Sequence, residues 1–185
     1  GRLPIHTFNI GGLWTRATRY IFKLQSGWPH GHQAGSVMAM SALGNKDRFL
    51  QDFLKMLTSD IHAASFKPPT QPKGAYIPGK DPVHPYLDPW VRIADQSEQD
   101  KFDVAAGLQA ATEIVFRDLL QQIFNVAPNS NLCLAGGVTL NSVMVGKITD
   151  WFPEITSIYV TSTPHDGGLP LGAAQYVWHQ VLNNA

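Results

Sequence analysis

The spacing of hydrophobic residues predicts helices along most of the chain and only a few strands. Residues 3–10 alternate loosely between apolar and polar positions, and Pro4 indicates that a strand there lies at a sheet edge. Over roughly residues 13–24 the apolar positions recur every three or four residues, which predicts an amphipathic helix. Residues 36–43 are expected to form a short buried helix, and the spacing within residues 47–57 predicts another.

A much longer apolar stripe lies in the second half of the chain. Ser97 and Asp100 resemble a helix-capping pair, and the stripe that follows them continues to Asn125. At 1.5 Å per residue such a helix is about 40 Å long, which is enough to cross the face of a domain.

The C-terminal third predicts two strands, each followed by a helix. Within residues 131–141 a short apolar run and the pair Gly136-Gly137 lead into a helix over residues 138–152, which ends before Pro153. Residues 155–160 form a second apolar run, and residues 169–182 predict a final helix. This order implies parallel strands joined by a right-handed crossover. In the final helix, the residues expected to face inward are Ala173, Ala174, Val177, Val181 and Leu182.

Prolines interrupt the regular pattern between residues 67 and 90. They are so dense that neither a regular helix nor a central strand is expected to run through most of this segment. We expect a long surface loop, and a docking surface for a partner domain is the alternative.

Composition limits the classes of function. The 185 residues suffice for one domain with a substantial core. Fourteen Lys and Arg balance fourteen Asp and Glu, so the charge indicates no broad surface for nucleic acid or an anionic membrane. No apolar run reaches about 18 residues and no signal-peptide pattern is present, so we expect a cytoplasmic protein. The single cysteine, Cys133, is expected in the core rather than as a nucleophile.

Two loops follow the two expected strands, so both should lie at the same sheet edge, where ligands of open α/β sheets bind. The first contains Gly136 and Gly137, which let a phosphate or adenosine group approach the backbone. The second contains Asp166, Gly167 and Gly168. Asp166 is a candidate ligand for a divalent metal, and the alternative is a helix-capping or turn aspartate.

Asn141 and the histidines each have two interpretations. Asn141 follows the glycine pair by one helical turn, so its amide is a candidate contact for a ribose or base; the alternative is a solvated helix residue. The histidines that invite a metal interpretation are His30, His32, His62, His84 and His165. Their spacing is not that of a zinc site and no cysteine pair accompanies them, which favours loop histidines without metal. No nucleophile elbow, phosphate loop or dinucleotide fingerprint is present, so the catalytic residues are not identified.

Two blocks of sequence carry a family resemblance. Residues 131–142 read Asn-Leu-Cys-Leu-Ala-Gly-Gly-Val-Thr-Leu-Asn-Ser, and residues 163–174 read Thr-Pro-His-Asp-Gly-Gly-Leu-Pro-Leu-Gly-Ala-Ala. Together they resemble the end of the catalytic domain of the O-carbamoyltransferases of the nodulation, cephamycin and tobramycin type. Residues 35–44 resemble a Gly-Lys-Val-Met-Gly-Leu-Ala block of that family more weakly, with Ser36 in place of the lysine.

This resemblance implies an actin-like ATPase fold, a ribonuclease-H-like α/β domain shared with threonylcarbamoyl-adenosine tRNA-modifying proteins and sugar kinases. Family members form carbamoyl-adenylate from carbamoyl phosphate and ATP in a separate domain, and then transfer the carbamoyl group to a hydroxyl of a small-molecule acceptor. A metal held by a His-x-x-x-His pair and an aspartate binds the adenylate phosphate. By resemblance, Asp166 is the metal ligand, and the residues that line the nucleotide are Gly136, Gly137, Asn141, Gly167 and Gly168. One carboxylate does not distinguish iron, manganese and magnesium.

The chain departs from the family pattern in one respect. His30 and His32 are two residues apart, so the His-x-x-x-His pair has no match. The chain therefore resembles the second half of an actin-like domain, a mostly helical half-domain over residues 1–185 with a small mixed sheet. We expect the metal histidines and the adenylate-forming domain in the rest of a parent protein, and we expect the fragment alone to be inactive.

Two other functions stay open. Actin-like sugar kinases also end with a Gly-Gly turn and a Gly-Ala-Ala helix around ATP. A noncatalytic nucleotide-binding or interaction module, with the proline-rich segment as its docking surface, is the third interpretation. An exposed sheet edge is also expected to pair with another chain, including a second copy. The acceptor is not readable from these residues.

Overall fold

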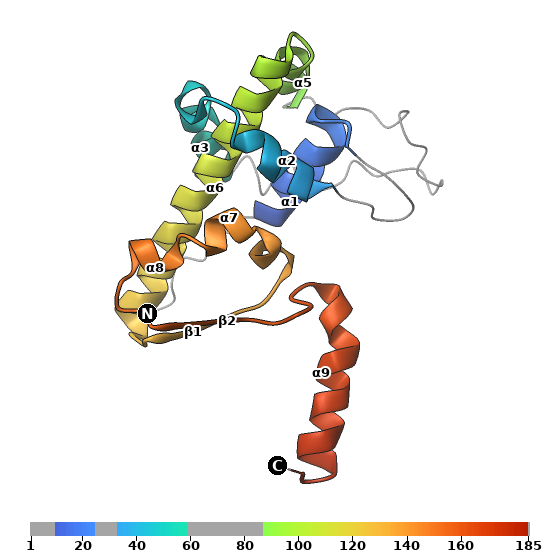
Figure 1. The fold of residues 1–185 in the computed structure, drawn as a ribbon, viewed down its shortest axis with the longest axis vertical. Coiled ribbons are helices and arrows are strands. Elements are labelled where there is room, and N and C mark those ends of the chain that lie inside the picture. The colour runs from blue at the N-terminus through green and yellow to red at the C-terminus, as the bar shows by residue number, and fades with distance from the viewer. Residues whose placement is uncertain (1–9, 25–32, 59–86, 185) are drawn as a thin grey trace. The chain divides into compact units, whose positions relative to one another are not determined.

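A computed structural model describes residues 10–24, 33–58 and 87–184 of the chain (Figure 1). It divides into two compact units, Gly1–Asp118 and Leu119–Ala185, and the boundary falls within one long helix. The predicted edge strand at residues 3–10 and most of the proline-rich segment lie outside the described residues. None of the described helices combines the length and apolar character that crossing a bilayer requires.

Helices build the described part of the first unit. They are α1 (Ile10–Arg16) with a π-helical turn (Ala17–Ile21), α2 (Ala34–Ser41), a 3-10 turn (Lys46–Arg48), α3 (Leu50–Thr58), α5 (Asp88–Ala94) and α6 (Glu98–Val126). The helices expected near residues 13–24, 36–43 and 47–57 are therefore present. The first begins earlier than expected, at Ile10, because glycines at its first turn cost little when packing holds the helix.

Two expectations for this unit are wrong. Helix α2 fully buries only Val37 and is otherwise half-buried or exposed, whereas a buried helix was expected. Helix α5 begins at Asp88, inside the segment expected to be a loop. Its Pro89 lies in the first helical turn, where the missing N–H removes no intrahelical bond, so a proline there does not prevent a helix.

Close packing against α6 forms the core of the first unit. The ring of Phe53 stacks on Trp90 with centroids 4.7 Å apart, and Phe49 meets the same indole edge-on at 5.3 Å. Gly107 permits this approach, because a Cβ atom there would lie 2.9 Å from the Cβ of Phe49. Trp14 Nε1 donates a hydrogen bond of 2.8 Å to Thr112 Oγ1, which ties α1 to α6.

Helix α6 confirms the expected long helix. The hydroxyl of Ser97 accepts a 3.0 Å hydrogen bond from the backbone N–H of Asp100, as the capping pair predicts. The helix has 29 residues, so it is about 43 Å long at 1.5 Å per residue.

The second unit contains a two-stranded parallel sheet. Its elements are β1 (Asn131–Leu134), a 3-10 turn (Gly137–Leu140), α7 (Ser142–Val145), α8 (Ile148–Trp151), β2 (Ser157–Val160), a 3-10 turn (Asp166–Gly168), α9 (Leu169–Tyr176) and a π-helical turn (Val177–Val181). The strands pair in parallel as predicted, with Asn131 opposite Ser157 and Leu134 opposite Val160. The described chain is thus mostly helical with a small parallel sheet, which is compatible with an α/β fold.

The helix expected over residues 138–152 is wrong as a continuous element. The backbone of Asn141 has ψ 83°, which is not helical, and its side chain accepts a hydrogen bond from the N–H of Met144. Asparagine competes for backbone hydrogen bonds in this way, so it ends the first turn and starts α7. Gly146 then closes α7 before α8 begins.

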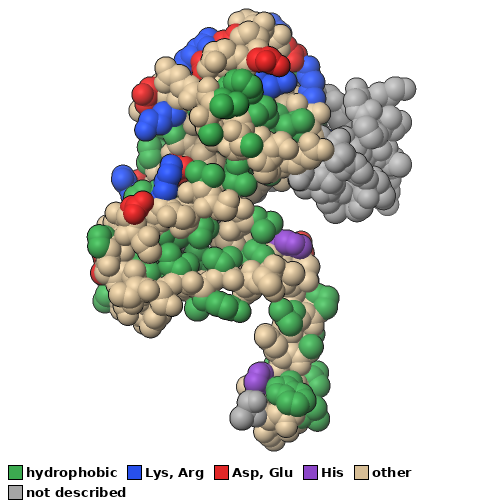
Figure 2. Space-filling model, viewed as in Figure 1, with side chains coloured by type: hydrophobic (Ala, Val, Ile, Leu, Met, Phe, Trp, Pro, Cys, Tyr) green, Lys and Arg blue, Asp and Glu red, His purple; other side chains and the backbone are tan. Residues whose placement is uncertain are grey.

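The inward face expected for the last helix is also wrong. All of α9 and the turn that follows it are exposed, and Figure 2 shows hydrophobic side chains on the surface of this segment. Tyr176 and Trp178 are 63% and 52% exposed. Cys133 is exposed as well, although a core position was expected. Periodicity identifies which face is apolar, but burial needs a second layer, and no described element covers these residues.

The exposed residues expected to face inward are Ala173, Ala174, Val177, Val181 and Leu182.

Candidate functional site

The two predicted ligand loops lie side by side at the carboxyl ends of the parallel strands. The backbone N–H of Gly136, after β1, donates a 2.6 Å hydrogen bond to the carbonyl of Pro164, after β2. The expectation that both loops open at one sheet edge is therefore confirmed. In open α/β sheets this edge is where ligands bind.

Backbone conformation explains the glycine at position 136. Gly136 has φ 101° and ψ 151°, a combination that side chains other than glycine rarely adopt. Its carbonyl accepts hydrogen bonds from the N–H of Thr139 at 3.0 Å and from the Thr139 hydroxyl at 2.7 Å. Thr139 is buried, so the turn is anchored from inside while the glycine itself is open to solvent.

The second loop is held by His165. Its Nδ1 atom accepts a 2.9 Å hydrogen bond from the N–H of Gly167, and its carbonyl accepts one of 2.9 Å from the N–H of Gly168. A Cβ atom on Gly168 would lie 2.3 Å from the carbonyl oxygen of Thr163, so this glycine permits a close backbone approach. The loop is thus a tight turn whose one side-chain cap comes from a histidine.

Asp166 is exposed at the start of this turn. Within the described residues its carboxylate makes no hydrogen bond or ion pair, and the capping position belongs to His165. The capping alternative for Asp166 therefore lacks support, since a capping aspartate accepts a backbone N–H. The alternative of a turn aspartate stays open, because Asp166 is the first residue of the 3-10 turn. No group of three or more His, Cys, Asp or Glu suitable for a metal occurs in the described ranges, so Asp166 is a single candidate ligand.

Asn141 is buried at 9% exposure, so the alternative of a solvated helix residue is wrong. Its Oδ1 atom accepts a 3.1 Å hydrogen bond from the N–H of Met144, which caps α7. That the side-chain amide of Asn141 contacts a ribose or base stays a prediction. The sequence pattern did not identify the capping role, because the expected continuous helix left no N-terminus at this position.

His165 is the site residue that sequence reasoning missed, having been grouped with the loop histidines. The signal was its position two residues before Gly167, the spacing at which a short polar side chain caps a turn. The other histidines of that group, His30, His32, His62 and His84, lie outside the described residues.

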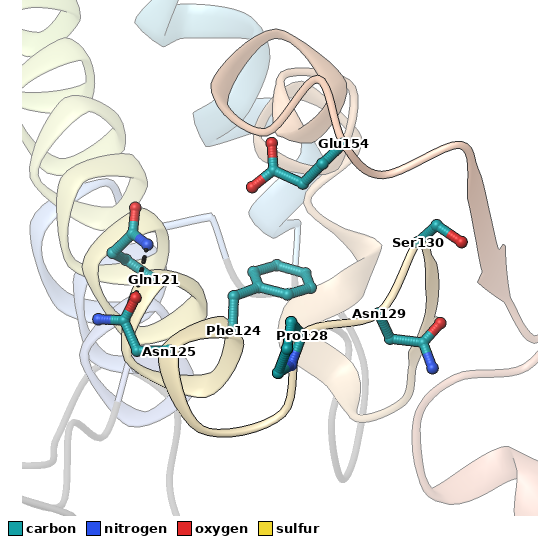
Figure 3. A pocket seen from close by; sticks show the side chains of 7 residues that line it. All are labelled: Gln121, Phe124, Asn125, Pro128, Asn129, Ser130 and Glu154. Carbon is teal, nitrogen blue, oxygen red and sulfur yellow. Dashed lines mark hydrogen bonds between the residues drawn. The ribbon is translucent and has the colours of Figure 1, made fainter.

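A pocket of about 420 Å³ lies at the other end of the strands. Figure 3 shows the side chains around it, among them Phe124, Ser130 and Glu154. Ser130 directly precedes β1 and Glu154 precedes β2, so a strand of four residues, about 13 Å, separates this pocket from the glycine loops. The pocket is therefore not part of the predicted site.

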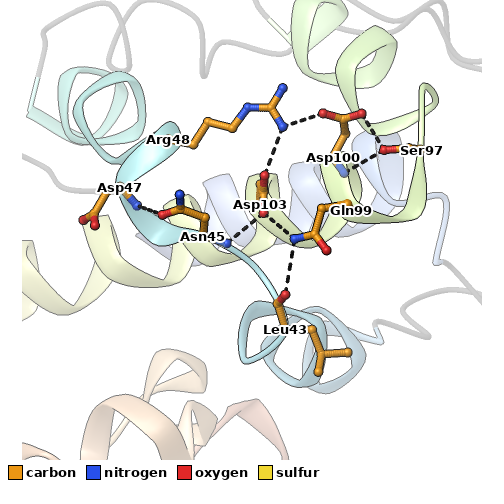
Figure 4. A network of polar contacts seen from close by, with 8 residues as sticks. All are labelled: Leu43, Asn45, Asp47, Arg48, Ser97, Gln99, Asp100 and Asp103. Atoms are coloured by element: carbon orange, nitrogen blue, oxygen red, sulfur yellow. Dashed lines mark hydrogen bonds and ion pairs between the residues drawn. The ribbon is translucent and has the colours of Figure 1, made fainter.

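A charged network in the first unit surrounds Arg48 (Figure 4). Arg48 pairs with Asp100 and, at 3.0 Å, with Asp103. The pKa of Asp100 is lowered, first by the hydrogen bond from Ser97 and then by the one from Arg48. Burial alone would raise the pKa of Asp103.

The donors around Asp103 more than offset that burial. They are the N–H of Asn45 at 2.7 Å, the amide of Gln99 at 2.8 Å and Arg48, and the net effect is a lowered pKa. Oδ1 of Asp103 accepts hydrogen bonds from Asn45 and Gln99, and Oδ2 accepts one from Arg48. The network joins the 3-10 turn to α6 and has the character of a structural clamp rather than a ligand site.

Comparison with known proteins gives one family and two relatives. Residues 2–175 match the family described as "Carbamoyltransferase N-terminus". The "Uncharacterized protein sll1178" of Synechocystis sp. is 38% identical over 86 residues, which are 46% of this chain and 14% of that protein. "Nodulation protein NolO" of Bradyrhizobium diazoefficiens is 29% identical over 147 residues, which are 76% of this chain and 24% of that protein. No solved structure matches the chain.

The chain thus spans about a quarter or less of the length of the curated relatives it matches.

Proposed function

Because the chain belongs to the carbamoyltransferase N-terminus family, we propose that it forms part of an enzyme that transfers a carbamoyl group to a hydroxyl of a small-molecule acceptor. The donor is carbamoyl-adenylate, made from carbamoyl phosphate and ATP in a separate domain. The hydroxyl oxygen of the acceptor bonds to the carbamoyl carbon and gives up its proton to solvent. The bond from that carbon to the phosphate oxygen breaks, and AMP leaves with the electron pair of that bond.

One observation carries this proposal. The hydrogen bond from Gly136 to Pro164 joins the two loops at the carboxyl edge of a parallel sheet, next to the exposed carboxylate of Asp166. Glycine loops accept a nucleotide phosphate, and a carboxylate holds the divalent metal that neutralises it. In this proposal Gly136, Gly137, Asn141, Gly167 and Gly168 line the nucleotide.

The rest of the metal site belongs to other parts of the parent protein. A bound iron, manganese or magnesium ion would supply electrostatic stabilisation of the adenylate phosphate as it leaves. We propose that the chain is one half of an actin-like, ribonuclease-H-like domain, and that the paired histidines and the adenylate-forming domain lie outside these 185 residues.

The test is a carbamoyl-transfer assay on the full-length protein. It supplies carbamoyl phosphate, ATP, a divalent metal and a panel of sugars and other hydroxyl acceptors, and detects the carbamoylated product by mass spectrometry. Asp166→Ala is expected to lower the rate by at least about 100-fold, because a metal's electrostatic contribution is worth several kcal/mol. Asp150→Ala removes an equally exposed carboxylate on α8 and should leave the rate unchanged.

Two outcomes contradict the proposal. Full activity of Asp166→Ala removes the metal role of this carboxylate. A phosphorylated acceptor in place of a carbamoylated one replaces the proposal with a sugar kinase.

A further inference from the structure

We propose that His165 contacts the phosphate of the bound adenylate by donating a hydrogen bond from Nε2. This inference rests on the proposed function and adds a ligand contact that is distinct from the metal ligand Asp166. It gives His165 a role in ligand binding in addition to its role in capping the turn.

The hydrogen bond on one ring nitrogen decides what the other can do. Nδ1 of His165 accepts the N–H of Gly167 at 2.9 Å, so Nδ1 carries no proton in this arrangement. A neutral imidazole then carries its proton on Nε2, which is a donor. The ring is therefore held in the tautomer that presents an N–H to a ligand oxygen.

The glycine after Asp166 makes room for this ring. A Cβ atom on Gly167 would lie 2.5 Å from Cε1 of His165, closer than real side chains allow, and 3.0 Å from Nδ1, which is also tight. The imidazole thus lies against a backbone that only glycine leaves free. His165 is exposed, so the turn fixes its orientation without burying it.

The ring also belongs to the edge where the phosphate is expected. A Cβ atom on Gly137 would have the Cβ of His165 as its nearest neighbour, at 3.8 Å, and no atom lies within 4 Å of the corresponding position on Gly136. His165 and the glycine turn therefore border the same open space. A donor N–H at that place complements an anionic oxygen, and such charge-assisted hydrogen bonds are stronger than neutral ones.

Two substitutions separate a ligand contact from a turn cap. His165→Asn keeps an acceptor where Nδ1 lies, so it can still accept the N–H of Gly167, but it lacks the distal donor. His165→Gln places an amide N–H close to the position of Nε2 and loses the proximal acceptor. A contact to phosphate predicts that Gln retains binding and Asn loses it, whereas a cap predicts the reverse.

Calorimetry on the full-length protein in the presence of the divalent metal provides the measurement, with AMP and adenosine as probes. His165→Asn is expected to weaken AMP binding by roughly tenfold to a hundredfold and to leave adenosine binding unchanged. His165→Gln is expected to bind AMP within about threefold of wild type. Thermal unfolding of each variant checks that the fold is intact.

The outcomes separate this inference from the proposed function. If wild type binds neither AMP nor adenosine, both proposals fail together. If wild type binds AMP and His165→Asn binds it equally well, the contact is absent while the proposed function stands. Equal loss of AMP and adenosine binding in His165→Asn likewise overturns the contact, because it indicates a change in the whole loop.

Discussion

The clamp around Arg48 and the loops after β1 and β2 use polar residues in opposite ways. In the clamp, the carboxylate of Asp103 is buried and receives hydrogen bonds from a backbone N–H, an amide and a guanidinium. In the loops, backbone bonds such as Gly136 to Pro164 hold the chain, and the carboxylate of Asp166 is exposed without a hydrogen bond among the described residues.

The difference separates residues that hold the fold from residues that are available to a ligand. A buried charge must be paired, so the clamp leaves no group over for binding. The loops are ordered by backbone hydrogen bonds together with the side chains of Thr139 and His165, which leaves the carboxylate of Asp166 with unused hydrogen-bonding capacity among the described residues. Substitutions in the two regions should therefore change different measured quantities, and three experiments test this.

The largest expected effect is on the core next to the clamp. Phe53 is fully buried and stacks on Trp90 at 4.7 Å. Phe53→Ala leaves a cavity and is expected to lower the free energy of unfolding by about 3–5 kcal/mol, measured by urea denaturation. Leu43→Ala, at a position 63% exposed, should change it by less than about 0.5 kcal/mol. Similar losses for both variants would mean that this core is not formed as described.

A smaller effect is expected from the clamp, and it depends on pH. The pKa of Asp103 in the folded protein is lowered below the unfolded value of about 3.9, so its stabilisation is present above about pH 4. That stabilisation is lost as the pH falls through the folded pKa. Asp103→Asn should lower the urea midpoint at pH 7, by less than Phe53→Ala does.

The clamp is tested by how the urea midpoints of wild type and Asp103→Asn depend on pH. The midpoint of wild type should fall more steeply than that of Asp103→Asn as the pH drops below about 4, so the two curves converge. Asp150→Asn, at an exposed carboxylate on α8, serves as the control and should follow wild type. Parallel curves for wild type and Asp103→Asn would show that the clamp does not select the ionised carboxylate.

The smallest expected effect on stability is in the loops. Asp166→Ala should change the free energy of unfolding by less than about 0.5 kcal/mol, because the carboxylate makes no described bond. Ser97→Ala provides the matched comparison: it removes the hydroxyl that accepts the N–H of Asp100 and should cost about 1 kcal/mol. An equal loss of unfolding free energy in Asp166→Ala would indicate that Asp166 caps the turn.

Local signals in the sequence predicted much of the fold correctly. The capping pair at Ser97 and Asp100, the stripe of α6 and the alternation of strands with helical segments are all visible within short windows. Parallel pairing and the common edge of the two loops follow from that order, because a strand that returns through a helical crossover runs in the same direction. The neighbourhood of Gly136 and Asp166 was predictable for this reason.

Other features are not visible in the spacing of apolar residues. The break at Asn141 arises because its side chain accepts the N–H of Met144, whereas the apolar spacing across residues 138–152 indicates one continuous helix. The exposure of Cys133 and of the last helix depends on which second layer covers an apolar face. The sequence does not distinguish His165 from other loop histidines, whereas the structure shows that its ring accepts the N–H of Gly167.

The sequence by itself determined where most of the described helices and both described strands lie, that these strands are parallel and which family the motifs resemble. These properties are encoded in spacing and in local backbone preferences, which act over a few residues. Only the tertiary structure decided that Asp103 is buried in a clamp, while Asp166 is exposed and makes no hydrogen bond or ion pair to the part of the chain that the structure describes. Asp103 and Asp166 are the same type of residue. The number of hydrogen-bond donors that the fold brings to each carboxylate distinguishes the stabilising residue from the candidate ligand.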